Sequence, residues 1–207
     1  MVTLRPMMGV LTGAVGVVAI VLVVSGLAKV VTPSATTPVL ADLRLPHSTI
    51  VVRGLGVVEV AIGTAALLVG SAGLHVAVAL LYIGFALVVV AARRAGTPSC
   101  GCFGASAAPP SAVHVAVNVC SAIVAVAAAL AGAAPVLDLI SDQPAAGVPF
   151  LMLMGTAAWL VVGLDTAGAD MVDQMAALRA AHSTRDVPPT SSVRATTRTN
   201  PVGQGPT

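Results

Sequence analysis

The sequence contains few charged residues and very few aromatic residues. Of its 207 residues, 9% are charged and 2% are aromatic, whereas 57% are hydrophobic and the mean hydropathy is +0.99. Soluble domains have about 25% charged residues. This composition therefore excludes a soluble globular domain and indicates an integral membrane protein. The net charge of +2 and the scarcity of aromatic rings also exclude a nucleic-acid-binding surface.

Apolar runs of membrane-spanning length make up most of the chain. A transmembrane helix needs about 20 apolar residues. The runs near that length are residues 7–31, 49–70, 74–92 and 113–133, with a shorter one at 148–164. Strands are not expected, because an open sheet edge cannot face lipid and the apolar runs are far longer than the strands of a membrane barrel. We therefore expect an all-α, polytopic membrane helical bundle of four core transmembrane helices plus a fifth at 148–164.

The two ends of the chain need separate interpretation. Arg5 before the first run would also fit a signal peptide, but the run exceeds the about 7–15 residues of a signal-peptide core and no small-x-small cleavage site follows it. Apolar residues at helical spacing predict an amphipathic interfacial segment at 166–182. Residues 183–207 are rich in Thr, Ser and Pro and predict a disordered tail. The bundle should therefore cover residues 1–165.

Two connections carry further expectations. Residues 32–48 contain three prolines and predict a loop, in which 39–45 could form a partial interfacial helix. Asp138 and Asp142 predict a polar loop before the fifth run.

Two of the three cysteines lie one residue apart in the connection between the third and fourth runs. Cys100 and Cys102 flank a glycine, and Arg93 and Arg94 precede them. Nearby positive charge favours the reactive thiolate. A disulfide across so short a loop would be readily reduced and would add little stability. The pattern therefore predicts a catalytic redox pair, with the arginines stabilising the thiolate.

Metal binding is the main alternative chemistry for the cysteines. Cys100, Cys102, His114 and Cys120 could supply soft ligands to zinc or copper. Their spacing matches none of the common structural zinc patterns, so we predict no metal site. The other alternative is an inert loop with incidental cysteines.

Glu59 is the most informative polar residue within a span. A carboxylate this deep in a membrane is costly unless it is protonated, paired or facing water, so we assign it to the site, together with Arg53. The alternative is a buried pair with Arg53 or Lys29 that only fixes helix packing. By span count, both basic residues share the side of the membrane that carries Cys100.

Other polar residues in that half of the bundle have simpler interpretations. Lys29 could extend to the lipid headgroups, and His114 suits the interface. Cys120 can be a small apolar residue, and Asn118 lies at a similar depth. His75 lies near the opposite side, so we leave it out of the site.

The cysteine loop carries a family resemblance. Arg93 to Gly96, followed by Cys100-Gly101-Cys102-Phe103-Gly104, resembles the MauE branch of the DoxX-like membrane proteins, over about residues 9–133. Supporting features are the run from Gly26 to Lys29, Glu59 and Gly63. The resemblance implies a four-helix core in the bacterial plasma membrane. It also implies thiol–disulfide exchange by Cys100 and Cys102 with a thioredoxin-like or exported cysteine-containing partner, in support of redox-protein maturation.

The expected function is therefore a membrane thiol–disulfide redox protein. Glu59, with Arg53, would transfer protons or bind a lipid-soluble electron carrier such as a quinone. A non-catalytic scaffold subunit of a redox complex, or a metal or small-solute carrier lined by Glu59, are the alternatives. Sidedness stays open. The bias of positive charge toward the cysteine side places Cys100 in the cytoplasm, whereas oxidation of exported proteins requires the outside. That bias consists of Lys29, Arg44, Arg53, Arg93, Arg94 and the tail arginines, against Arg5 on the opposite side.

Overall fold

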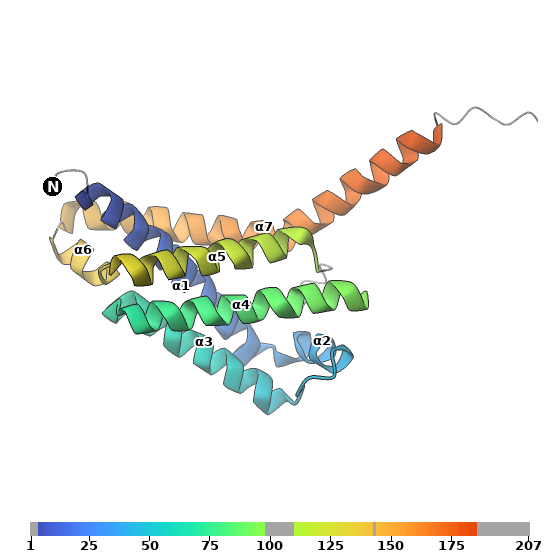
Figure 1. The fold of residues 1–207 in the computed structure, drawn as a ribbon, viewed down its shortest axis with the longest axis horizontal. Helices are drawn as coiled ribbons and strands as arrows, with labels where there is room; N and C mark the ends of the chain where they lie inside the picture. The colour runs from blue at the N-terminus through green and yellow to red at the C-terminus, as the bar shows by residue number, and fades with distance from the viewer. Residues whose placement is uncertain (1–3, 98–109, 143, 186–207) are drawn as a thin grey trace, which may run out of the picture. The chain divides into compact units, whose positions relative to one another are not determined.

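The computed structural model describes residues 4–97, 110–142 and 144–185. The described residues are mainly helical and include no strand, which confirms the all-α prediction (Figure 1). In chain order the elements are α1 (Leu4–Val31), η1 (Pro33–Ala35), α2 (Thr37–Asp42), α3 (Thr49–Val69), α4 (Ala72–Ala95), α5 (Ala112–Ala131), α6 (Val136–Asp142) and α7 (Pro144–Arg185). They belong to two compact units, Met1–Asp173 and Gln174–Thr207.

Within the part of the chain that the structure describes, five helices are long and apolar enough to cross a membrane. The candidate spans are Gly9–Val31, Thr49–Val69, Ala72–Ala95, Ala112–Ala131 and Ala146–Leu164. They correspond to the four expected core spans and the expected fifth. Helix α7 continues beyond the fifth span to Arg185, so residues 166–182 are helical, and their place along the membrane surface stays a prediction. The predicted disordered tail begins three residues too early, because residues 183–185 belong to α7, and the rest of it, 186–207, lies outside the described residues.

Within the first unit, the long helices pack as two pairs. Helix α1 packs along α3 and α4 packs along α5, and contacts between α1 and α5 join the pairs (Figure 1). Leu22 of α1 and Val78 of α4 are fully buried in the core between them. The Tyr82 hydroxyl donates a hydrogen bond of 2.8 Å to the Val18 carbonyl, which ties α4 to α1.

Serine and glycine set the helix boundaries around the core. Gly70 adopts a left-handed conformation (φ 59°) and ends α3, and the Ser71 hydroxyl accepts the Leu74 N–H and begins α4. Gly96 (φ 68°) ends α4 in the same way. The Thr97 hydroxyl then donates to the Ala92 carbonyl at 3.3 Å. These bonds close the C-terminal end of α4.

Two expectations about the connections change. The short helix in the first connection is α2, Thr37–Asp42, which begins two residues earlier than the expected 39–45. The expectation of a polar loop at Asp138 was wrong, because that aspartate lies in α6. Val136, Leu139 and Ile140 recur at the i, i+3, i+4 spacing of a helical turn, so their apolar face outweighs the aspartates on the other face.

Candidate functional site

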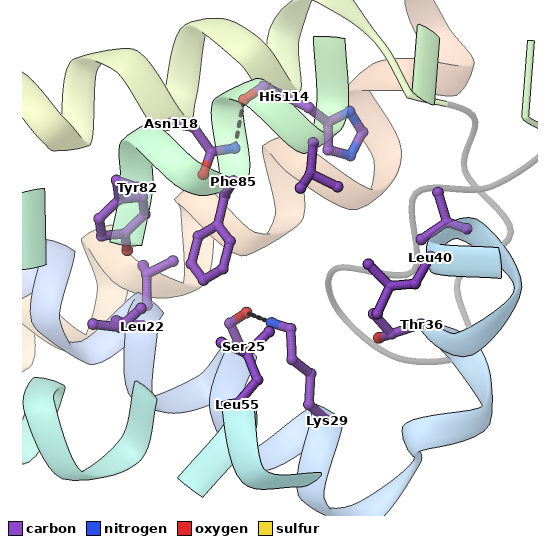
Figure 2. Close-up of a pocket in the computed structure, with 13 residues that line it drawn as sticks. Leu22, Ser25, Lys29, Thr36, Leu40, Leu55, Tyr82, Phe85, His114 and Asn118 are labelled. Carbon is purple, nitrogen blue, oxygen red and sulfur yellow. Dashed lines mark hydrogen bonds between the residues drawn. The ribbon is translucent and has the colours of Figure 1, made fainter. Parts of the chain in front are cut away.

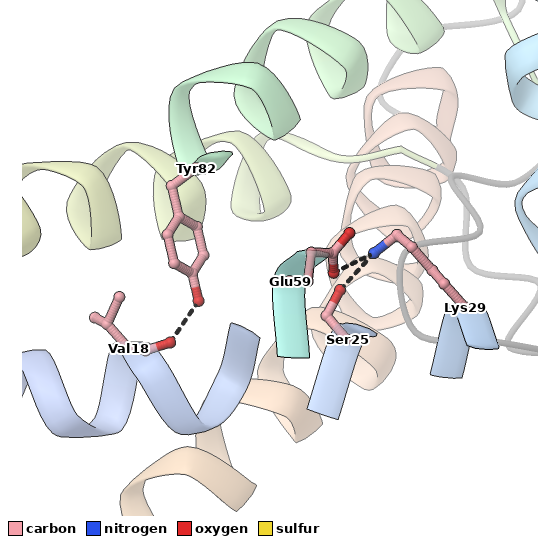
Figure 3. Close-up of polar contacts among 5 residues, drawn as sticks. All are labelled: Val18, Ser25, Lys29, Glu59 and Tyr82. Carbon is pink, nitrogen blue, oxygen red and sulfur yellow. Dashed lines mark hydrogen bonds and ion pairs between the residues drawn. The ribbon is translucent and has the colours of Figure 1, made fainter. Parts of the chain in front are cut away.

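A buried ion pair joins α1 to α3. Lys29 Nζ lies 2.9 Å from Glu59 Oε2 and donates a second hydrogen bond, 2.6 Å long, to Ser25 Oγ (Figure 3). Glu59 is fully buried and Lys29 is 4% exposed. Lys29 is therefore not an interfacial side chain but the internal counter-charge that makes a carboxylate tolerable at this depth.

Glycines bring the two charged residues together. A Cβ built on Gly26 would lie 2.6 Å from the Gly56 carbonyl oxygen and 2.8 Å from Glu59 Cβ. A Cβ on Gly56 would lie 2.6 Å from the Gly26 carbonyl oxygen and 3.0 Å from Lys29 Cβ. The backbones of α1 and α3 can approach this closely only because both positions lack a side chain. The close contact fixes the rotation of each helix so that the ammonium and the carboxylate face each other.

We expect Gly56→Ala to lower the free energy of unfolding by about 1–3 kcal/mol, because the added methyl group forces α1 and α3 apart. Unfolding in detergent, followed by circular dichroism, measures this. Gly54→Ala is the matched control on the same helix, since a Cβ there meets nothing within 4 Å. Equal stability of the two variants would contradict the proposed close approach.

Phe85 of α4 completes the surroundings of the ammonium. Lys29 Nζ lies 4.9 Å from the centroid of the Phe85 ring, a distance suited to a cation–π interaction. Tyr82 packs edge-on against Phe85, with ring centroids 6.0 Å apart. Sequence reasoning missed Ser25 and Phe85. Ser25 could have been found, because it precedes Lys29 by four residues and so shares its helix face, whereas nothing in the sequence distinguishes Phe85.

The first turns of α5 contribute a second polar group. The Ser111 hydroxyl accepts the His114 N–H, and His114 Nδ1 accepts the Ser111 N–H, each at 3.3 Å. This capping box holds the imidazole against the start of the helix. One turn later, Asn118 Nδ2 donates to the His114 carbonyl at 2.7 Å. His114 is 2% exposed, so its ring is buried within the bundle, and its depth in the membrane stays a prediction.

A cavity of about 60 Å³ lies between these two polar groups. Figure 2 shows Ser25 and Lys29 on one wall, His114 and Asn118 on the opposite wall, and Phe85 between them. The remaining walls are mainly apolar and come from α1, the η1 and α2 segment, α3 and α4. They are formed by Val21, Leu22, Thr36, Val39, Leu40, Leu55, Tyr82 and Val88. The cavity lies at the end of the bundle where α4 ends and α5 begins.

The other predicted site residues lie elsewhere. Cys100 and Cys102 lie outside the described residues. Arg53 is exposed, and Glu59 pairs with Lys29. Arg93 and Arg94 are exposed in the last turn of α4, ahead of the cysteine loop, and their action on its thiols stays a prediction.

Cys120 and His75 also carry potential ligand atoms. Cys120 is an exposed free cysteine. His75 is 1% exposed, and its two ring nitrogens have no hydrogen-bond partner among the described residues. No group of three potential metal ligands occurs within residues 4–97, 110–142 and 144–185.

Comparison with known proteins adds one finding. Residues 7–135, more than half of the chain, match the family described as methylamine utilisation protein MauE. No curated protein and no solved structure gives a significant match. The matched region begins in α1 and ends just before α6, so it contains the ion pair, the cavity and the cysteine loop.

Proposed function

Because the chain belongs to the MauE family of multi-pass membrane proteins, we propose that it is a thiol–disulfide exchange protein of the bacterial plasma membrane. The observation that carries the proposal is the Cys100-Gly101-Cys102 sequence in the connection between α4 and α5, which follows two exposed arginines in the last turn of α4. A thiolate favoured by nearby guanidinium groups, one residue from a second thiol, is suited to reversible exchange.

The exchange has two steps. One thiolate of the Cys100 and Cys102 pair attacks a sulfur of a partner disulfide, which forms a mixed disulfide and releases the partner's other sulfur as a thiolate. The second cysteine then attacks the mixed disulfide, so the pair closes and the partner leaves reduced. Two electrons have passed to the partner. The reverse sequence oxidises a partner dithiol, and a thioredoxin-like or exported cysteine-containing protein suits either direction.

The direction of electron transfer depends on which side of the membrane carries the cysteine loop. Arg44, Arg53, Arg93 and Arg94 are all exposed, so they form the positive bias expected of cytoplasmic connections. Lys29 no longer counts toward this bias, because its charge is buried and paired. On this side the pair would relay reducing equivalents from cytoplasmic thiols, whereas on the other side it would oxidise exported proteins.

Trapping of the mixed disulfide tests the proposal. In cells expressing Cys102→Ser or Cys100→Ser, the remaining thiolate forms a mixed disulfide that the missing cysteine cannot resolve. We expect at least one variant to give a higher-mass adduct that disappears on reduction. The matched control is Cys120→Ser, which leaves the pair intact and should accumulate no adduct. Failure of both single variants to trap a partner would contradict the proposal.

A further inference from the structure

The cavity beside the ion pair has the features of a ligand site. Its volume of about 60 Å³ is several times the about 10–15 Å³ that one water molecule needs, so it can hold a compact headgroup but not a whole lipid. Most of its lining is aliphatic or aromatic, and its polar groups come mainly from α1 and α5. This combination is typical of sites that bind a mainly apolar molecule through a small polar head.

The charge balance of the cavity favours a ligand whose polar group is uncharged. Lys29 carries the positive charge at the cavity wall, and Glu59 compensates it at 2.9 Å. A charged ligand would therefore lose its hydration without gaining an unpaired counter-charge. A neutral molecule with hydrogen-bond acceptors does not have this penalty.

The polar groups offer hydrogen-bond donors on two opposite walls. The Lys29 ammonium has three N–H groups, of which Ser25 and Glu59 take two among the described residues. The Asn118 amide has two N–H groups, and one of them donates to the His114 carbonyl. Phe85 lies between the two walls and offers an aromatic surface (Figure 2).

We propose that this cavity binds the ring of a membrane quinone, a planar neutral ring with carbonyl oxygens on opposite sides. One carbonyl accepts a hydrogen bond from Lys29 and the other from Asn118, with the ring packed beside Phe85. The isoprenoid tail lies outside the cavity. The inference deepens the proposed function on which it rests: closure of the cysteine dithiol to a disulfide yields two electrons and two protons, and reduction of a quinone to a quinol takes up both.

Direct binding tests the site without any need for turnover. Purified full-length protein in detergent is titrated with a benzoquinone that carries a ten-carbon tail, and equilibrium dialysis measures the bound fraction. We expect saturable binding at one site. Val88→Phe adds a ring that fills the cavity from α4 and should weaken binding by about tenfold or more. Asn118→Leu should also weaken it, because one carbonyl loses its donor.

The matched control for filling the cavity is Val90→Phe, because Val90 lies on the same helix in a separate groove facing outward between α4 and α5. It should bind like the wild type. Equal binding by Val88→Phe, or no saturable binding by the wild type, would overturn the inference. The Cys100→Ser/Cys102→Ser variant should bind normally, so loss of thiol exchange and loss of quinone binding are separable outcomes.

Discussion

Lys29→Met is expected to lower the free energy of unfolding by about 3–5 kcal/mol, because it leaves the fully buried Glu59 carboxylate without its counter-charge. Methionine is similar in length to lysine, so the loss of stability reflects the missing charge and not a large new cavity. The measurement is the unfolding midpoint of the purified protein in detergent, at a pH where carboxylates are ionised.

A second variant separates the charge from the packing. Lys29→Met combined with Glu59→Leu removes both charges and should recover most of the lost stability, since a buried pair is often replaceable by apolar residues. Arg53→Met is the control, because Arg53 is an exposed basic residue on the same helix as Glu59 and should change stability by less than about 0.5 kcal/mol. If Lys29→Met were no more destabilising than Arg53→Met, the ion pair would not contribute to the stability of the bundle.

The double replacement Cys100→Ser/Cys102→Ser is expected to abolish thiol–disulfide exchange with a partner, down to the uncatalysed rate, because serine hydroxyls cannot form disulfides. Its melting temperature should stay within a few degrees of the wild type, since so short a disulfide loop adds little stability. The measurement is the redox state of cysteine-containing proteins in cells, read by thiol alkylation and electrophoresis.

The same variant separates an exchange protein from a scaffold. A non-catalytic subunit that only positions other proteins would keep its effect on those cysteine-containing proteins without the two thiols. Cys120→Ser controls for the loss of a cysteine as such, because Cys120 lies on the exposed face of α5. Full activity of the double variant would exclude the exchange mechanism and favour the scaffold.

The sequence allowed the helical architecture to be predicted because lipid restricts a spanning segment to a long apolar helix. The position of Glu59 was informative for the same reason, since a carboxylate at that depth needs compensation. Which basic residue compensates it was harder to predict. Arg53 and Glu59 are six residues apart, which places them about 120° apart around α3. The close contact between Gly26 and Gly56 instead orients Lys29 of α1 toward the Glu59 carboxylate.

The burial of His114 also could not be predicted from its position in the sequence, because it depends on its hydrogen bonds with Ser111. An imidazole near a helix start suits the interface, but the capping box with Ser111 satisfies its backbone N–H and one ring nitrogen, so the ring can be buried. Together with Asn118 it forms a wall of the cavity. No periodicity within a single helix predicts such a cavity, because its described lining comes from several segments far apart in the sequence.

A redox titration of the cysteines tests the central claim most directly. The purified protein is equilibrated across glutathione buffers and then alkylated with a maleimide, and mass spectrometry counts the labelled thiols. We expect Cys100 and Cys102 to change together in a single two-electron transition, with a tenfold change in their ratio for about 30 mV, while Cys120 stays labelled throughout. Independent labelling of the two cysteines, or two thiols that remain reduced at every potential, would contradict the account.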